Sequence, residues 1–143
     1  MGVTVESRAH RTLKSAAHYR KVDWTELLEI YGSNLFELVD EESPIGFYYN
    51  YVDSVEMSIV VTNLGLHIFS NHNWRLISFD DLVDVNSQLS YKDVPKDSVN
   101  ELFLSLVDGS TFVLNVLGKD GRYKDVFDFH RFLLRVIGDR AEQ

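Results

Sequence analysis

Hydrophobic positions follow a helical period between Asp23 and Pro44. Seven apolar residues fall there at positions i, i+3, i+4, i+7, i+11, i+14 and i+15: Trp24, Leu27, Leu28, Tyr31, Leu35, Leu38 and Val39. They line one face of a helix. Asp23 and Glu26 have the spacing of a capping box, so we expect the helix to begin after Asp23. Pro44 ends the segment, and Gly32-Ser33-Asn34 is a potential break that would leave residues 35–39 as a last turn or a short strand.

The segment before this helix has a weaker pattern. Residues 6–21 are compatible with a helix, but its apolar stripe contains little more than Leu13 and three alanines. We expect residues 1–43 to be a helical extension that packs on the rest of the chain.

After Pro44 the period changes from 3.6 to 2, which is typical of half-buried strands. Seven strands are predicted, at 46–52, 57–62, 66–70, 74–79, 82–87, 101–107 and 111–117. Between them stand clusters of Asn, Asp and Gly, which tolerate positive φ angles in turns. The loop at 90–98 is the longest. The chain therefore reads as one α+β unit, with residues 44–143 forming its body.

The C-terminal part returns to a helical period after Asp120 or Gly121, either of which could cap the helix. One stripe contains Tyr123, Val126, Phe127, His130, Leu133, Leu134 and Ile137. A second stripe contains Phe129, Phe132 and Val136. One face is enough to seat a helix on a sheet, so something else must bury the second. The 24–39 helix is one candidate, and a dimer partner is the other.

Composition removes several classes of site. The chain has no cysteine, which excludes disulfides, thiolate nucleophiles and cysteine-ligated metal centres. No apolar run reaches the length of a membrane-spanning helix, and the first residues lack the apolar core of a secretory signal. We therefore expect a cytoplasmic protein without an integral membrane segment.

Charge is unevenly distributed along the chain. The formal net charge is −8, and residues 1–22 contain five Lys or Arg against Glu6 alone, so the remaining residues carry −12. A body this acidic disfavours nucleic acid and anionic lipid as ligands. The basic segment is expected to be a solvated helix or a frayed terminus. Contact with an acidic surface, the chain's own included, and attachment to a membrane surface are the alternatives.

Four stretches, taken in their order along the chain, resemble motifs of the bacterial pleckstrin-homology (PH) and GRAM-like family. They are IVVTNLGLHIF (59–69), RLISFDDLVDV (75–85), LSLVDGSTFVLNV (104–116) and VFDFHRFLLRVI (126–137). The resemblance covers residues 46–138. It implies an antiparallel barrel of about seven strands closed by a C-terminal helix, to which residues 1–43 would be an addition.

The resemblance does not extend to the family's lipid site. Phosphoinositide-binding members hold phosphates with lysines and arginines on the first two strands and the loop between them. The corresponding residues 48–58 contain neither, and they include Asp53 and Glu56. The resemblance therefore implies a scaffold that presents surfaces to proteins rather than to phosphoinositides, and such a fold does not fix function.

Histidines and acidic residues offer weak signs of chemistry. His67 and His72 lack the close spacing or cysteine partners of a zinc site. His130 lies near Asp128, but no nucleophile motif accompanies them. The acidic group around Asp80 lacks the spacing of a calcium loop. Likewise, Gly118-Lys119-Asp120-Gly121 matches no phosphate-binding motif. We expect no catalytic residue, no metal and no cofactor.

Aromatic residues form the most distinctive local pattern. In Phe47-Tyr48-Tyr49-Asn50-Tyr51 both faces of the predicted strand contain an aromatic ring, and such rings are favoured at interfaces. Together with the second stripe of the last helix they give a candidate interaction surface: Tyr48, Tyr49, Tyr51, Phe129, Phe132 and Val136. The leading hypothesis is a non-enzymatic module that binds a protein partner or a second copy of itself, as in a homodimer. The alternative is a small-molecule-binding or hydrolytic protein with a pocket near His67, His72 or His130.

Overall fold

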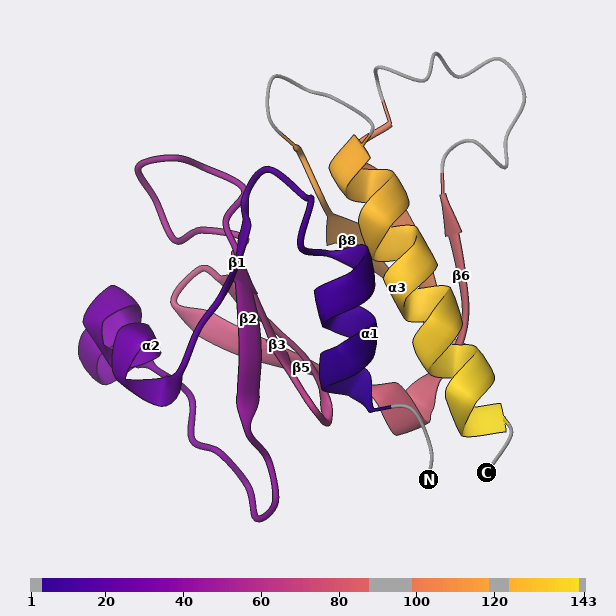
Figure 1. The fold of residues 1–143 in the computed structure, drawn as a ribbon, viewed down its shortest axis with the longest axis horizontal. Helices are drawn as coiled ribbons and strands as arrows, with labels where there is room; N and C mark the ends of the chain where they lie inside the picture. Colours follow the sequence, from indigo (N-terminus) through magenta and orange to yellow (C-terminus); the bar gives the residue numbers. More distant parts are fainter. Residues whose placement is uncertain (1–3, 88–98, 119–123, 142–143) are drawn as a thin grey trace.

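The computed structural model describes residues 4–87, 99–118 and 124–141. In chain order the elements are α1 (Val5–Thr12), β1 (Tyr19–Lys21), α2 (Trp24–Tyr31), the 3₁₀ turn η1 (Gly32–Asn34), β2 (Pro44–Tyr48), β3 (Ile59–Thr62), β4 (Gly65–Ser70), β5 (Asn73–Ser78), the 3₁₀ turn η2 (Phe79–Asp81), β6 (Leu82–Ser87), β7 (Glu101–Leu106), β8 (Thr111–Asn115) and α3 (Lys124–Ala141) (Figure 1). The predicted loop at 90–98 and the predicted caps of the last helix lie outside the described residues.

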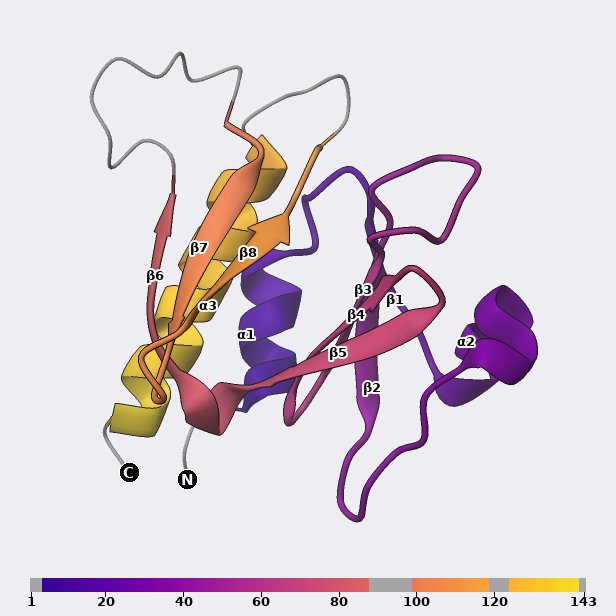
Figure 2. The same ribbon diagram turned by 180° about the vertical axis from the view of Figure 1, so that it is seen from behind.

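The strands form two separate antiparallel sheets, and the predicted closed barrel is wrong. One sheet has the order β1-β2-β3-β4-β5 and the other β6-β7-β8. A barrel closes only when its first and last strands pair. Here β1 takes the outer edge of β2, with Tyr19 opposite Tyr48 and Lys21 opposite Gly46. The strand β5 leads through η2 into the second sheet, which packs against α3 (Figure 2).

The N-terminal segment is only partly helical. The helix α1 ends at Thr12, and the strand β1 occupies residues predicted to be helical. Side chains from α3 hold the turn between them, because Asp125 accepts a hydrogen bond from the Ala17 amide at 3.0 Å. β1 also needs a glycine opposite it, since a Cβ atom at Gly46 would overlap the ring of Tyr19.

The predicted helix after Asp23 is correct at its start and wrong at its end. The capping box is present: Asp23 accepts from the Glu26 amide at 2.8 Å, and Glu26 accepts from the Asp23 amide at 3.2 Å. The helix stops at Tyr31 because Gly32 has φ 59°, a conformation that favours glycine. Residues 35–43 then run without a helix or strand.

Two hydrophobic cores lie on opposite faces of the five-stranded sheet. The larger one contains α1, α3, the second sheet and one face of the first. The smaller one contains α2, residues 35 and 36 and the other face of the first sheet. The second stripe of α3 is therefore buried in the larger core, and α2 does not cover it. Among the described residues, none of the helices combines the length and hydropathy that a membrane crossing requires.

Candidate functional site

The best candidate for a functional surface is the loop that follows β2, residues 49–55, which we call the Tyr51 loop. It folds back on itself through a bridge between Tyr51 and Ser54. Tyr51 is 43% exposed and Val52 is 87% exposed, the latter the highest value among the exposed large hydrophobic residues. An apolar tip held out in solvent is unusual for a turn, since turns favour Gly, Asn, Asp, Pro and Ser.

A buried asparagine fixes the base of this loop. The Asn50 amide donates hydrogen bonds to the carbonyls of Met57 at 2.6 Å and Asn115 at 2.9 Å. Its Oδ1 accepts from the Leu117 amide at 2.8 Å. The bonds to Asn115 and Leu117 tie the loop to the end of β8, at least 65 residues later in the chain, and the bond to Met57 closes the loop on itself. A loop anchored in this way loses little conformational entropy when a ligand binds.

A histidine supports the aromatic ring at the start of the loop. The ring of His18 stacks on Tyr49, with ring centroids 4.4 Å apart and an interplanar angle of 14°. Backbone and side chain reinforce the contact, because the Tyr49 amide donates to the His18 carbonyl at 3.2 Å and His18 Nδ1 lies 3.1 Å from the Tyr49 carbonyl oxygen. His18 therefore holds Tyr49 in a fixed orientation beneath the loop.

Two hollows adjoin at the Tyr51 loop. One, of about 550 Å³, is also lined by Ala17, His18, Asn50 and Gly118. The other, of about 630 Å³, is also lined by Phe47, Ser54 and Val55. Both share Tyr49, Tyr51, Val52 and Asp53. The loop thus forms an apolar ridge between two depressions, a shape suited to a protruding partner surface on each side.

The structure separates the six predicted interaction residues. Tyr49 is half-buried and Tyr51 is exposed, and both belong to the Tyr51 loop. The other four side chains are fully or almost fully buried in the larger core: Tyr48, Phe129, Phe132 and Val136. Tyr48 also donates a hydrogen bond to Asp125 at 2.9 Å. Burial of these four leaves them unavailable to a partner in the folded chain.

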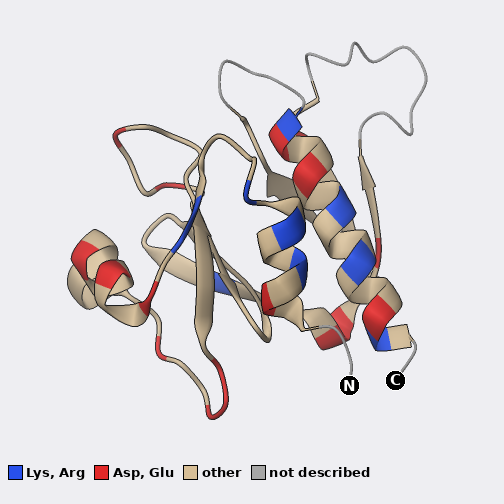
Figure 3. Ribbon diagram, viewed as in Figure 1, with Lys and Arg blue, Asp and Glu red and all other residues tan. Residues whose placement is uncertain are grey.

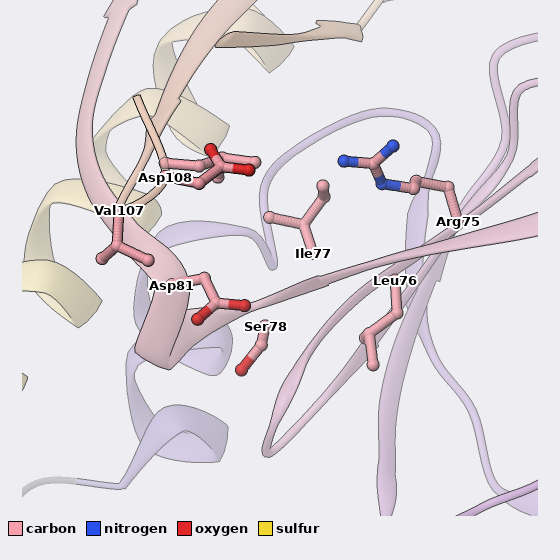
Figure 4. Close-up of a pocket in the computed structure, with 8 residues that line it drawn as sticks. Arg75, Leu76, Ile77, Ser78, Asp81, Val107 and Asp108 are labelled. Atoms are coloured by element: carbon pink, nitrogen blue, oxygen red, sulfur yellow. The ribbon is translucent and has the colours of Figure 1, made fainter. Parts of the chain in front are cut away.

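A third hollow, of about 290 Å³, lies where β5 passes into the second sheet. The residues that line it include Arg75 from one side and Asp81 and Asp108 from the other (Figure 4). Hydrogen bonds from Ser110 lower the pKa of Asp108, and the nearby Arg75 adds to the shift. Opposite charges face a shared space here and Ser78 also lines it, but no histidine, cysteine or tyrosine does. A histidine base for the serine is therefore missing from the described lining.

The three histidines of the catalytic or metal hypothesis lie in different environments. His67 is buried beneath the segment 35–43, His72 is exposed in the β4–β5 turn with φ 65°, and His130 is half-buried on α3. The described residues contain no group of three or more histidine, cysteine or carboxylate side chains arranged to hold a metal.

His67 instead belongs to a buried polar cluster. Its Nε2 lies 2.7 Å from Glu42 Oε2, and the same oxygen accepts a hydrogen bond from Thr62 at 2.7 Å. Glu42 Oε1 accepts from the Val39 amide at 3.2 Å. The ring of Phe36 stacks on His67 with centroids 3.7 Å apart. The cluster fastens the irregular segment 35–43 to the sheet.

Burial and hydrogen bonding set the protonation states of this pair. Burial favours the neutral form of His67 and lowers its pKa, although the hydrogen bond to Glu42 acts in the opposite direction. Burial alone would raise the pKa of Glu42, but the hydrogen bonds from His67, Thr62 and Val39 outweigh it, so the pKa is lowered. A neutral His67 that donates Nε2–H to an ionised Glu42 fits both directions.

Sequence reasoning missed the residues that shape the site: His18, Asn50 and Val52. His18 belongs to a segment predicted to be helical, so its contact with Tyr49 had no local signal. Asn50 was placed on a strand face, where its bonds to Met57 and Asn115 could not be inferred. Val52 was the last residue of a predicted strand, and the early end of β2 at Tyr48 brings it to the tip of a loop instead.

Comparisons with known proteins give no further assignment. No protein-family model, no curated protein and no solved structure matches the chain.

Proposed function

We propose that the chain is a non-enzymatic interaction module that binds a partner protein through the Tyr51 loop. The observation that supports this most directly is the exposed pair Tyr51 and Val52, held on a base that Asn50 fixes by three hydrogen bonds. Exposed apolar side chains on a rigid support lose little entropy on binding and gain from burial. The resemblance to PH-like domains is compatible with this function and stays a prediction.

The alternative of a histidine-lined pocket receives no comparable support. A hydrolytic or small-molecule site needs polar groups that converge on one cavity. His67, His72 and His130 lie in three environments, and the hollow around Arg75 contains Ser78 but no histidine among its described lining residues. Binding through the Tyr51 loop is therefore the better-supported proposal.

Site-specific photo-crosslinking in cells tests the proposal. A photo-reactive amino acid at position 52 should give a discrete adduct, and the adduct should disappear when Tyr51→Ala is added. The matched control places the same amino acid at Val83, an exposed apolar residue of β6. An adduct of equal yield at both positions, or none at position 52, would reject the loop as a binding surface.

A further inference from the structure

The outer surfaces on the two sides of the five-stranded sheet have opposite charge. On one side α1 and α3 lie next to each other, and the exposed charged residues of these helices and of the turn after α1 include five that are basic (Figure 3). We call these the basic face: Arg11, Lys14, Lys124, Arg131 and Arg135. This face contains more than a third of the 14 Lys and Arg residues of a chain whose net charge is −8.

Carboxylates near the basic face do not neutralise it from the outside. Asp128 is buried and bound by Lys124 at 3.0 Å. Asp125 is buried and accepts hydrogen bonds from Tyr48 and the Ala17 amide. Asp139 is paired with Arg8 at 2.7 Å, where both side chains are about one-fifth exposed. Glu6 on α1 is exposed, so the described residues of this side include one exposed carboxylate against five exposed basic residues. The exposed charge of this face is therefore mainly basic.

The opposite side of the sheet is acidic. Residues 22–74 contain nine Asp or Glu and no Lys or Arg. Those at the surface of α2 and the segment around it form what we call the acidic layer: Asp23, Glu29, Glu37, Asp40 and Glu41. In Figure 3 the acidic residues of α2 lie on the far side of the five-stranded sheet from the basic residues of α1 and α3.

Each charged surface also contains exposed apolar side chains. On the basic face Phe127 and Leu134 are 43% and 46% exposed, and the guanidinium of Arg131 lies 5.5 Å from the centre of the Phe127 ring. In the acidic layer Leu28 and Val39 are 47% and 58% exposed. Apolar residues surrounded by charges of one sign are typical of an interface whose partner has the opposite sign.

We propose that the basic face docks on the acidic layer of a second copy of this chain, head to tail. The chain itself provides the complementary surface, with charges of opposite sign and its own exposed apolar residues. Nucleic acid and anionic membranes would also attract the basic face, but their extended field acts on the whole molecule, whose net charge of −8 opposes approach. Contact between two local patches depends mainly on charges within a Debye length of about 8 Å at physiological salt.

This contact is heterologous, because it joins two different surfaces. The two surfaces lie on opposite sides of the sheet, so docking leaves one basic face and one acidic layer free at the ends. Assembly therefore continues beyond the dimer unless the arrangement closes into a ring. The proposal does not use the Tyr51 loop and is independent of the function proposed above.

Sedimentation velocity on the full chain provides the test. The wild-type mass should rise with protein concentration and fall towards that of the monomer at high salt. Neutralising Arg131 and Arg135 together (R131Q with R135Q) should weaken association about tenfold, because two exposed charge pairs are removed. Neutralising Glu29 and Glu37 (E29Q with E37Q) should have the same effect. The control variant, R75Q with D84N, removes exposed charges elsewhere and should behave as the wild type.

Mixing the two neutralised variants distinguishes head-to-tail docking from a symmetric contact, in which both copies use the same surface. The variant with R131Q and R135Q keeps its acidic layer, and the variant with E29Q and E37Q keeps its basic face. An equal mixture should therefore form a dimer through these two intact surfaces, and the two neutralised surfaces at its ends should prevent further growth. Neutralisation is preferred to charge reversal, since reversed charges would create a second complementary pair.

Three outcomes would overturn the proposal. The first is a wild-type chain that stays monomeric at all protein concentrations. If this monomer co-sediments with vesicles of phosphatidylcholine and phosphatidylglycerol, the basic face binds anionic lipid instead. The second is self-association that neither neutralised variant weakens. The third is loss of self-association in V52D alone, which would assign the contact to the Tyr51 loop.

Discussion

The two faces of the five-stranded sheet bury their hydrophobic residues in different ways. The face towards α1 and α3 is covered by helices, and its sheet residues are largely aliphatic, such as Ile59, Val61 and Ile68. The face towards α2 is covered by one short helix and an irregular segment, and aromatic rings fill the space. Its rings include Phe36, Phe47, Phe69 and Trp74.

The second face also depends on polar contacts. The indole of Trp74 donates to the Asn34 carbonyl at 2.6 Å, and Ser43 donates through its amide to Asn63 at 2.7 Å. The Glu42–His67–Thr62 cluster lies beneath the same segment. A helix satisfies its own backbone, whereas a segment without regular structure must find partners elsewhere. Buried hydrogen bonds also occur in the larger core, such as that from Tyr48 to Asp125, so the difference lies in the cover. The larger core is covered by helices, while the smaller core is covered partly by an irregular segment that side-chain hydrogen bonds hold in place.

The largest expected effect comes from the larger core. Phe132→Ala should lower the free energy of unfolding by about 3–5 kcal/mol, because it empties the space of a fully buried ring that contacts Phe79 edge-on. Urea denaturation measures the change. Phe127→Ala on the exposed side of the same helix is the matched control and should change it by less than about 1 kcal/mol. Equal effects would mean that the two sides of α3 are buried alike.

A smaller effect is expected from the polar cluster of the second face. Glu42→Ala removes the acceptor for His67, Thr62 and the Val39 amide, so it should cost about 2–4 kcal/mol. Glu41→Ala, at the exposed neighbouring position, serves as the control. Hydrogen exchange should rise first in residues 35–43. Loss of protection across both cores at once would show that the second face is not a separate unit.

The smallest expected effect is a pH dependence confined to the second face. Both His67 and Glu42 have lower pKa values in the folded chain than their ordinary values of 6.5 and 4.5. The unfolded chain therefore binds protons at a higher pH than the folded one. Stability should be fully present above pH 6.5 and should decrease as the pH falls, by at most about 1.4 kcal/mol per pH unit for each group.

His67→Gln tests this dependence, because glutamine can donate to Glu42 but does not titrate between pH 4.5 and 6.5. The variant should flatten the upper part of the stability profile measured by urea denaturation. His72→Gln, at the exposed turn, should leave the profile as in the wild type. A profile that falls equally in all three proteins would place the titrating group elsewhere.

Much of the sheet could be predicted from the sequence. Alternating residues such as those of 82–87 and 101–106 belong to strands with one buried face, and the structure confirms strands there. The capping box could also be predicted from neighbouring residues, since Asp23 and Glu26 form both expected hydrogen bonds. These signals depend on residues close in sequence, so a pattern is sufficient to find them.

The errors concern contacts between residues far apart in sequence. Tyr19–Lys21 is a strand only because the edge of β2 is available to pair with it, and that pairing in turn prevents closure of a barrel. After Gly32 the predicted stripe does not persist: Leu35 packs on the smaller core, whereas Val39 is 58% exposed. Phe36, which lies outside the stripe, stacks on His67 instead. Tyr48 looked like a surface aromatic because its hydrogen bond to Asp125, 77 residues away, has no local signature.

The pairing of α1 with α3 has a consequence for the order of folding. The bidentate contact between Arg8 and Asp139 joins residues 131 positions apart, and Ala9 and Leu13 of the first helical segment are buried in the same core as Phe132 and Val136. Contacts this distant form late, because most of the chain must first be closed into a loop. During synthesis the apolar side of α1 therefore stays exposed to solvent until α3 has left the ribosome and can pack against it.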